Sequence, residues 1–381
     1  MTERAPESIH PVARLPEEWQ SAVTAMGERP FRARQVFRWI HGRGVTAPDS
    51  MSDLPRSFRE QLSQLGLGMP LEVTDVLRAR DGTRKLVSTV QGGAKIESVI
   101  IPMSDTPEDD PEDDEGPWDG RVTLCVSTQI GCAMGCVFCA SGQIGLDRGL
   151  GAEEIVAQVL LARRHLARGE HLRNLVFMGM GEPLHHYDQT ARAIRLLTHA
   201  DGFAMSPRRI TVSTVGLVPG IRRLGEDFGG KVGLALSLHA PNDAVRSRIL
   251  PMNERYPIAK VLGAIRAYPL PKRRRITIEY TLIAGVNDEI AHARELSRLL
   301  RGLRVKVNLI PMNPIGGSQL GAPSPGRVEA FREALASEGL SAFVRKQRGD
   351  DVDAACGQLV LKERLARKAS MARSECSEGC S

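Results

Sequence analysis

The stretch Cys132-Ala-Met-Gly-Cys136-Val-Phe-Cys139 holds three cysteines within eight residues, at a C-x3-C-x2-C spacing. The run just before it, residues 122–127, is apolar and β-branched, which predicts a buried strand. Three glycines follow within ten residues of Cys139 and predict a loop. We therefore expect the cysteines on a loop at the carboxyl end of a strand, where α/β folds place their chemistry.

Downstream of the cysteines, strand-like and helix-like patterns alternate with short connections. With the run before the cysteines, the expected strands are residues 122–127, 174–178, 209–214, 232–238, 276–283 and 305–310. The expected helices are residues 152–168, 187–200, 218–224, 258–268, 288–301 and 326–337. This alternation predicts an α/β fold with a parallel sheet. Six units, where a full TIM barrel has eight, predict a partial (β/α)6 barrel.

The rest of the chain predicts smaller units around this barrel. Ala33, Val36, Phe37 and Ile40 have helical spacing, and residues 71–101 alternate with a period of two around Asp81-Gly82 and Gly92-Gly93 turns. The expected units are a helical accessory domain at 1–70, an antiparallel β extension at 71–103, an acidic disordered insert at 104–120, the barrel at 121–345, and a C-terminal segment with a mobile tail at 346–381.

Composition limits the class of protein. The 381 residues are 42% hydrophobic and 25% charged, as in ordinary soluble globular proteins. No apolar run approaches the length of a membrane span, and the N-terminus has no signal-peptide core. We therefore expect a cytoplasmic protein with no membrane partner. We also expect a monomer. Seven cysteines, three of them in one loop, suit a metal or catalytic site better than a disulfide framework.

The charge balance is more basic than the net value of +6 suggests. Nine of the 45 acids lie in residues 104–119, which contain no base, so the rest of the chain carries 51 bases against 36 acids. Such an excess suits a phosphate-rich partner, and general solubility is an equally good explanation. The candidate RNA contacts are the arginines between Arg29 and Arg43 in the helical domain, the basic run 272–275 and the basic run 345–348.

Three cysteine thiolates are suited to an iron–sulfur cluster or to zinc. A structural zinc needs four ligands, and the only other nearby cysteine, Cys125, lies inside an expected strand. A four-iron cluster held by Cys132, Cys136 and Cys139 would leave one iron open to a substrate's amine and carboxylate. Zinc binding and passive electron transfer remain as alternatives.

Further polar residues follow the downstream strands. Met178-Gly-Met-Gly-Glu-Pro183 comes after the second barrel strand, and its glycines allow a ligand to approach the backbone closely. Residues at or just past other strand ends are Ser213, Ser237, His239 and Asn313. Each of these alone is typical of a loop cap or a core position. Together at the open face of a barrel they predict a ligand pocket.

The cysteine spacing, with the aromatic Phe138 before the last cysteine, resembles the radical S-adenosylmethionine (SAM) superfamily. That resemblance implies a six-unit partial barrel and one [4Fe-4S] cluster held by Cys132, Cys136 and Cys139, with SAM on the open iron. It implies that one electron splits SAM into methionine and a 5′-deoxyadenosyl radical. It also implies that SAM is bound by Gly181, Glu182, Ser213, Ser237, Leu238, His239 and Asn313.

A finer resemblance, from about residue 30 to 359, is to the RlmN/Cfr family of RNA adenine methyltransferases. It is carried by the runs 123–132, 179–183, 237–239, 311–314 and 348–358, of which Arg348-Gly-Asp-Asp-Val-Asp-Ala-Ala-Cys-Gly-Gln358 is the most specific. The acidic insert and Cys376 and Cys380 in the tail depart from the family pattern without touching a motif.

The family chemistry is reasonable for adenine C2, an electron-poor carbon that cannot attack the methyl group of SAM. The resemblance implies that Cys356 takes a methyl group from one SAM, that a second SAM supplies the radical, that Glu97 accepts the C2 proton, and that Cys125 releases the product through a transient disulfide with Cys356. Taken alone, Cys125 is typical of a core residue, Cys356 of a loop residue, and Glu97 of a solvent-facing strand residue.

The implied partners are an adenosine in the peptidyl-transferase centre of 23S rRNA, the adenosine 3′ of the anticodon in some tRNAs, and an electron donor such as flavodoxin. A target base inside folded RNA must be splayed out to react. Two alternatives remain: methylation of adenine C8 by the sister chemistry of the same family, and a non-catalytic RNA-binding protein that carries an iron–sulfur cluster or zinc.

Overall fold

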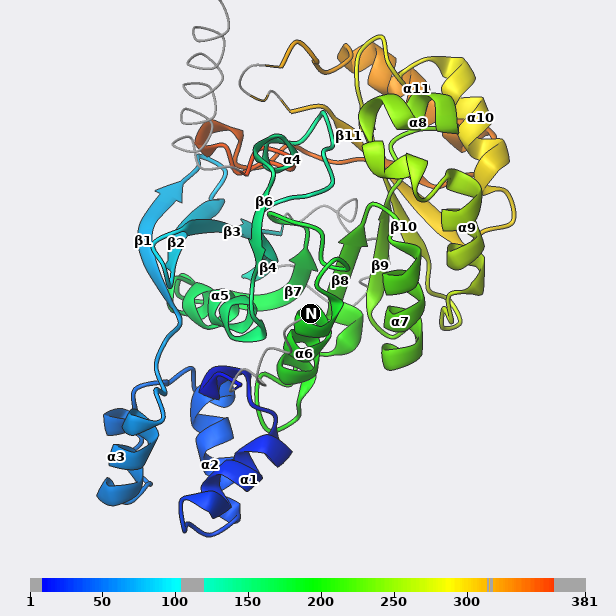
Figure 1. Cartoon of the computed structure of the whole chain (residues 1–381). Coiled ribbons are helices and arrows are strands. Elements are labelled where there is room, and N and C mark those ends of the chain that lie inside the picture. Colours follow the sequence, from blue (N-terminus) through cyan, green and yellow to red (C-terminus); the bar gives the residue numbers. More distant parts are fainter. Residues whose placement is uncertain (1–8, 104–119, 314, 316–317, 360–381) are drawn as a thin grey trace, which may run out of the picture.

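The computed structural model describes residues 9–103, 120–313, 315 and 318–359. The predicted acidic insert, apart from Gly120, and the tail with Cys376 and Cys380 lie outside the described residues. Figure 1 shows a lobe of helices at the N-terminus, a β extension and a large α/β unit. Within the described ranges, no helix is both long enough and apolar enough to cross a membrane.

One ten-stranded sheet, with the order β1-β2-β3-β4-β7-β8-β9-β10-β11-β12, forms the frame of the molecule. Its parallel part confirms the six predicted strands: β4 (Arg121–Cys125), β7 (His171–Phe177), β8 (Ile210–Thr214), β9 (Gly233–Ser237), β10 (Ile276–Leu282) and β11 (Val305–Pro311). A seventh parallel strand, β12 (Ala342–Val344), adds to β11 and was not predicted. The sheet curves without closing, so the fold is the predicted partial barrel.

Helices follow the barrel strands and cover the outside of the sheet (Figure 1). The predicted helices are α5 (Ala152–Arg164), α6 (Tyr187–Thr198), α7 (Val218–Phe228), α9 (Ile258–Ala267), α10 (Ile290–Leu300) and α11 (Pro325–Ser337). Two shorter helices, α4 (Ala140–Ile144) and α8 (Asp243–Ile249), were missed because five and seven residues are too few for a periodic pattern. The same holds for the small antiparallel pair of β5 (Gln129–Gly131) and β6 (Leu146–Gly149).

The two faces of the parallel strands differ in chemistry. Outward residues such as Val212, Leu236 and Ile278 are fully buried under the helices. Inward residues are mostly polar and partly exposed; they include Thr123, Asn174, Thr211, Thr277, Lys306 and Asn308. The apolar core of this unit therefore lies between sheet and helices, and the concave face of the sheet is a polar, accessible lumen.

The N-terminal region consists of a helical lobe and three strands. The lobe contains α1 (Pro16–Ala25), α2 (Phe31–Phe37), a π-helical turn (Arg38–Gly42) and α3 (Arg56–Gln64) around the buried Trp19, Phe37 and Phe58. The strands β1 (Leu71–Arg78), β2 (Arg84–Val90) and β3 (Lys95–Pro102) are antiparallel, as predicted. Because β3 pairs with β4, this extension continues the barrel sheet, and Val99 lies opposite Cys125.

Candidate active site

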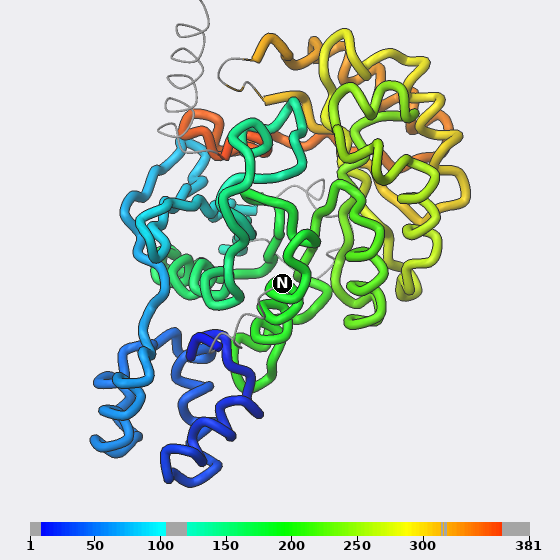
Figure 2. Tube along the Cα trace, viewed as in Figure 1, coloured from blue at the N-terminus to red at the C-terminus, as the bar shows by residue number. Residues whose placement is uncertain are grey.

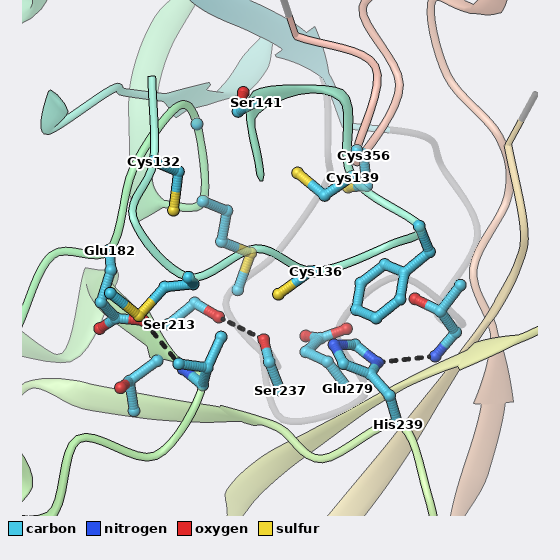
Figure 3. Close-up of a pocket in the computed structure, with 18 of the residues that line it drawn as sticks. Cys132, Cys136, Cys139, Ser141, Glu182, Ser213, Ser237, His239, Glu279 and Cys356 are labelled. Atoms are coloured by element: carbon cyan, nitrogen blue, oxygen red, sulfur yellow. Dashed lines mark hydrogen bonds between the residues drawn. The ribbon is translucent and has the colours of Figure 1, made fainter. Parts of the chain in front are cut away.

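The three clustered cysteines lie on the loop between β5 and α4, at the carboxyl end of the parallel strands. Cys132, Cys136 and Cys139 are free thiols that line one cavity, and Figure 3 shows them around the same space. The β5–β6 pair holds the base of this loop. Gly131 has a left-handed φ of +78°, and a Cβ there would collide with the carbonyl oxygen of Gly145. The loop therefore needs glycine at this point.

Burial dominates the electrostatics of these thiols. It raises the pKa of Cys132 to about 12 and that of Cys136 well above its ordinary value, and the pKa of Cys139 is raised for the same reason. Such thiols ionise only when a cation compensates them, as iron in a cluster does. Within the described ranges, no three His, Cys, Asp or Glu side chains form a site for a single metal ion. The cysteines thus supply soft sulfur ligands without the compact set that zinc requires.

The glycine-rich turn after β7 faces these cysteines with a buried carboxylate. Glu182 accepts hydrogen bonds from the backbone N–H of Leu184 (3.1 Å) and of Val215 (2.9 Å), and burial raises its pKa to about 7. Its own N–H donates to Oε1 of Gln129 (2.9 Å), and Gly181 packs so closely on Gln129 that a Cβ would clash. Glu182 is therefore held rigidly in the cavity wall, ready to bind a cationic group.

Residues from the next strand ends complete the wall. The hydroxyl groups of Ser213 and Ser237 lie 3.3 Å apart (Figure 3). Nδ1 of His239 accepts from the N–H of Thr281 (2.9 Å), so the proton of the neutral imidazole is on Nε2. Burial lowers the pKa of His239 to about 3, and its ring packs edge-on against Phe138, 4.5 Å away.

Leu238, which the sequence also predicts to bind the cofactor, does not line this cavity. Its side chain is fully buried in the core between the sheet and the helices. Only its backbone lies beside the site, where its N–H donates to the carbonyl oxygen of Glu279 (3.1 Å). Any contact between Leu238 and a cofactor in this cavity would therefore involve the backbone.

The C-terminal segment brings Cys356 to the cluster loop. The side-chain amide of Asn313 donates to the carbonyl oxygen of Cys356 (2.8 Å), and the N–H of Ala140 donates to that of Gly357 (2.8 Å). The Ser141 hydroxyl adds a bond to the Leu359 carbonyl. Cys356 consequently lines the same cavity as the three cysteines and appears beside Cys139 in Figure 3.

Cys125 lies at the inward-facing end of β4, beneath the C-terminal segment. It packs with Val99, Met180, Ala354 and Leu359 and is 7% exposed. Burial, with a further contribution from the nearby Cys356, raises its pKa to about 12. The fold thus brings together two cysteines that are more than two hundred positions apart in the chain.

Glu97 lies on the same face of the sheet, next to this pair rather than in the cavity wall. It is 3% exposed, and its Oε1 is 3.3 Å from Nζ of Lys85. Lys85 also donates to the carbonyl oxygen of Asp353 (3.2 Å), so the C-terminal segment covers both side chains. Figure 2 shows this segment against the β extension. The solvent-facing interpretation of Glu97 is therefore wrong, because Glu97 is buried on a strand face that the segment around Asp353 covers.

Two site residues were not predicted from the sequence. Glu279, in the middle of β10, lines the cavity at 4% exposure, and burial raises its pKa. Arg246 on α8 is fully buried and donates to the carbonyl oxygens of Leu238 (3.1 Å) and Val215 (2.6 Å). It ties together the loops after β8 and β9. A charged residue inside a run of β-branched residues was the available signal for Glu279; Arg246 gave none.

The candidate RNA contacts are spread over the molecule. Arg34 and Arg38 both donate to Oδ1 of Asp201, so in this structure they attach the helical lobe to the barrel. Residues 272–275 precede β10 and lie at the end of the sheet opposite the cysteines, where Arg275 donates to the Ser341 hydroxyl (3.0 Å). Arg345 lines the cysteine cavity, and it lines a second cavity with Arg348.

Comparisons with known proteins agree with this site. Residues 126–296 match the radical SAM superfamily, and residues 16–66 match the ribosomal RNA large subunit methyltransferase N-terminal domain. A protein of Sorangium cellulosum named dual-specificity RNA methyltransferase RlmN is 57% identical over 372 residues, 93% of this chain and 96% of that protein. One of the same name from Anaeromyxobacter dehalogenans is 48% identical over 355 residues, covering 91% of each chain.

A solved structure gives the same assignment. The crystal structure of a radical SAM methyltransferase from Sphaerobacter thermophilus matches 92% of this chain and 99% of that chain, with a TM-score of 0.85 and 43% identity. The match therefore includes both the barrel and the parts added to it. With these relatives in agreement over nearly the whole length, the chain belongs to the RlmN family of radical SAM RNA methyltransferases.

Proposed function

We propose that this chain methylates C2 of adenosine in 23S rRNA and in tRNA, with Cys356 as the carrier of the methyl group. The observation that supports this most directly is the position of Cys356, which lines the cavity of the cluster cysteines and has a second cysteine, Cys125, beside it. A methyl carrier has to meet SAM on one side and a thiol that releases the product on the other.

The donor set fits the cofactors that the family uses, a [4Fe-4S] cluster and SAM. Cys132, Cys136 and Cys139 would hold the cluster, and Glu182 would bind the amino group of SAM. Ser213, Ser237, His239 and Asn313 would line the remainder of the SAM pocket, and two SAM molecules would be used in each turnover. When bound, these cofactors supply a one-electron cleavage that yields a 5′-deoxyadenosyl radical.

Cys356 supplies what adenine C2 lacks. The Cys356 thiol loses its proton to solvent, and the resulting thiolate would take the methyl group of a first SAM, which would leave as S-adenosylhomocysteine. Hydrogen abstraction from this S-methyl group then gives a carbon radical that adds to C2. Asn313 and the cluster loop, which donate hydrogen bonds to the carbonyl oxygens of Cys356 and Gly357, hold this part of the backbone and keep the Cys356 side chain at the cavity.

Release of the product involves the two residues beneath the C-terminal segment. Glu97, held beside Lys85, accepts the proton from C2. The Cys125 thiolate attacks the Cys356 sulfur, which breaks the bond between that sulfur and the new carbon and forms a disulfide. The freed carbon takes up one proton and becomes the methyl group. The one electron that leaves the radical adduct would go to the cluster, oxidised during cleavage of SAM, and two electrons later reduce the disulfide; an electron donor such as flavodoxin would be the source of these reducing equivalents.

RNA as the substrate is supported by the names of the relatives, which are dual-specificity RNA methyltransferases, and by the N-terminal domain match. The finer assignment to one adenosine in the peptidyl-transferase centre and one next to the anticodon rests on the resemblance of the motifs. We expect the enzyme to act as a monomer without a membrane partner.

Anaerobic reconstitution tests the proposal. The protein, loaded with iron and sulfide and reduced, is given SAM and either protein-free 23S rRNA or tRNA, and the nucleosides are analysed by mass spectrometry and NMR. We expect 5′-deoxyadenosine and 2-methyladenosine, and neither from Cys132→Ala. Methylation at C8 would show the sister chemistry, and a brown protein that does not cleave SAM would show a non-catalytic cluster protein; either result overturns the proposal.

A further inference from the structure

A second cavity occupies the lumen of the open barrel, toward the amino ends of its strands. Its wall is the polar inward face of β4, β7, β8, β10 and β11, which includes Thr123, Asn174, Thr211, Thr277 and Asn308. This cavity is not lined by the residues that we expect to bind SAM, which are Glu182, Ser213, Ser237, His239 and Asn313. It is therefore a distinct cavity that adjoins the cofactor cavity and shares Met178, Glu279 and Arg345 with it.

This lumen cavity is basic. Seven of its lining residues are lysines or arginines and two are glutamates. The bases include Arg209 and Lys306 near the amino ends of the strands, and Arg345 and Arg348 near the C-terminal segment. SAM carries a cationic sulfonium group and gains nothing from such a wall. A nucleotide of an RNA chain, which carries phosphate, is the complementary ligand.

The lumen cavity leads to Cys356. A third, smaller cavity is lined by Ile101, Ile310, Arg345 and Cys356 among others, and it shares Ile101 and Arg345 with the lumen cavity. Apolar side chains of Ile101 and Ile310 beside a cysteine suit a planar base. A nucleotide in the lumen could thus bring its base to Cys356 through this smaller cavity.

Glu279 lies at the boundary between the cofactor cavity and the lumen cavity and lines both. Its Oε1 accepts from the side-chain amide of Asn308 (3.2 Å), whereas its Oε2, in a side chain that is 4% exposed, has no hydrogen-bond partner among the described residues. A buried carboxylate oxygen without a donor is costly and rare in a folded protein. A ligand in the cavity that offers an N–H would satisfy it.

We propose that the lumen cavity binds the target nucleotide of the RNA, and that Glu279 is a positioning residue that accepts a hydrogen bond from the 6-amino group of the target adenine. Guanine presents a carbonyl oxygen at this position, which would face the carboxylate oxygen as a second acceptor and be rejected. The inference rests on the proposed function, and it adds the compartment for the substrate and a determinant of base specificity.

Binding of two matched RNA hairpins to the reduced, cluster-loaded enzyme tests this role. One hairpin carries adenosine at the target position of an anticodon loop, and the other carries purine riboside, which lacks only the 6-amino group. We expect the wild type to bind the adenosine hairpin roughly ten- to hundredfold more tightly, the range for a hydrogen bond to a charged acceptor. Glu279→Leu should reduce this preference to less than about threefold.

Two controls separate this role from a structural one. Glu333→Leu, an exposed acid on α11, should keep the full preference for adenosine. SAM affinity and the slow formation of 5′-deoxyadenosine without RNA should be the same in Glu333→Leu as in the wild type, and SAM affinity is also measured in Glu279→Leu. An unchanged preference for adenosine in Glu279→Leu, or a loss of SAM affinity in place of that preference, would overturn the assignment and indicate that Glu279 contacts the cofactor.

The basic wall supplies a test that does not depend on the folding of a Glu279 variant. Lys306→Ala and Arg209→Ala should each weaken binding of both hairpins and lower the slope of log affinity against log salt by about one for each lost phosphate contact. An unchanged slope in both variants contradicts binding in the lumen. Absence of 5′-deoxyadenosine in the wild type would instead refute the proposed function, so the two failures are distinguishable.

Discussion

The two faces of the barrel strands differ in polarity and burial, although successive residues of each strand point alternately to one face and the other. In β10, Ile278 points outward and is fully buried under the helices, whereas its neighbour Thr277 points into the lumen and stays partly exposed. In an eight-stranded barrel the interior is packed with side chains. Here the sheet stays open, and its inner face is polar. Stability thus comes from the outer face, and the inner face is available for ligands.

The largest expected effect comes from an inner-facing site residue. Cys356→Ala should abolish formation of methylated adenosine, because no other thiol in the described part of the chain lines the cavity at that position to carry the methyl group. The free energy of unfolding should change by no more than about 0.5 kcal/mol, since Cys356 lies half-buried in a loop. Nucleoside mass spectrometry and urea unfolding measure the two quantities. Normal turnover by this variant would refute the carrier role.

Neighbouring residues of β10 allow a direct comparison of the two faces. Ile278→Ala removes a fully buried side chain and should lower the free energy of unfolding by about 2–5 kcal/mol. Thr277→Ala, one position earlier on the lumen face, should cost about 1 kcal/mol or less, mostly through lost β propensity. Urea unfolding of both variants measures the difference. Equal costs would mean that the lumen is packed as a second core.

The smallest effect concerns the outer side, where the helical lobe meets the barrel. His41 is fully buried beside Phe37 and Phe203, and burial lowers its pKa from 6.5 to about 3. Below pH 6.5 this histidine binds a proton in the unfolded chain and stays neutral in the folded chain. The free energy of unfolding therefore falls as the pH is lowered from 6.5 toward 3. Between pH 7 and pH 5 the loss is about 2 kcal/mol.

A single substitution isolates this contribution. His41→Phe keeps an aromatic ring in the cluster and cannot be protonated. Urea unfolding measures how far the free energy of unfolding falls between pH 7 and pH 5. This fall should be about 2 kcal/mol larger for the wild type than for the variant. His185, an exposed histidine that follows the glycine-rich turn after β7, serves as the matched control in a His185→Phe variant. Identical pH profiles for wild type and His41→Phe would contradict burial of the neutral ring.

Patterns along the sequence were sufficient for the outer face. The apolar residues of β7 to β11 recur with the period of a strand, and the six parallel strands and the helices between them were predicted close to their observed bounds. β12 was not predicted because it has only three residues and is defined as a strand only by its pairing with β11. Its position depends on tertiary contacts that no local pattern records.

The inner face was predictable only in part. The cysteine spacing and the glycines after β7 are local signals, and they led to the cofactor cavity. The burial of Glu97 depends on the C-terminal segment, which is far away in sequence and covers Lys85 and Glu97 through contacts such as that of Asp353. Glu279 was missed because an acid in a strand is usually solvent-facing, and here the open lumen lies on that side.

The central claim, that Cys356 carries the one-carbon group and Cys125 releases it, is tested most directly by the mass of the Cys125→Ala variant. Purified from cells or treated with SAM, reductant and an RNA hairpin, this variant should retain RNA covalently bound through a methylene bridge to Cys356, because the resolving thiol is missing. Nuclease digestion followed by peptide mass spectrometry should locate an adenosine adduct on Cys356. A variant free of RNA, with normal release of methylated adenosine, would contradict the account.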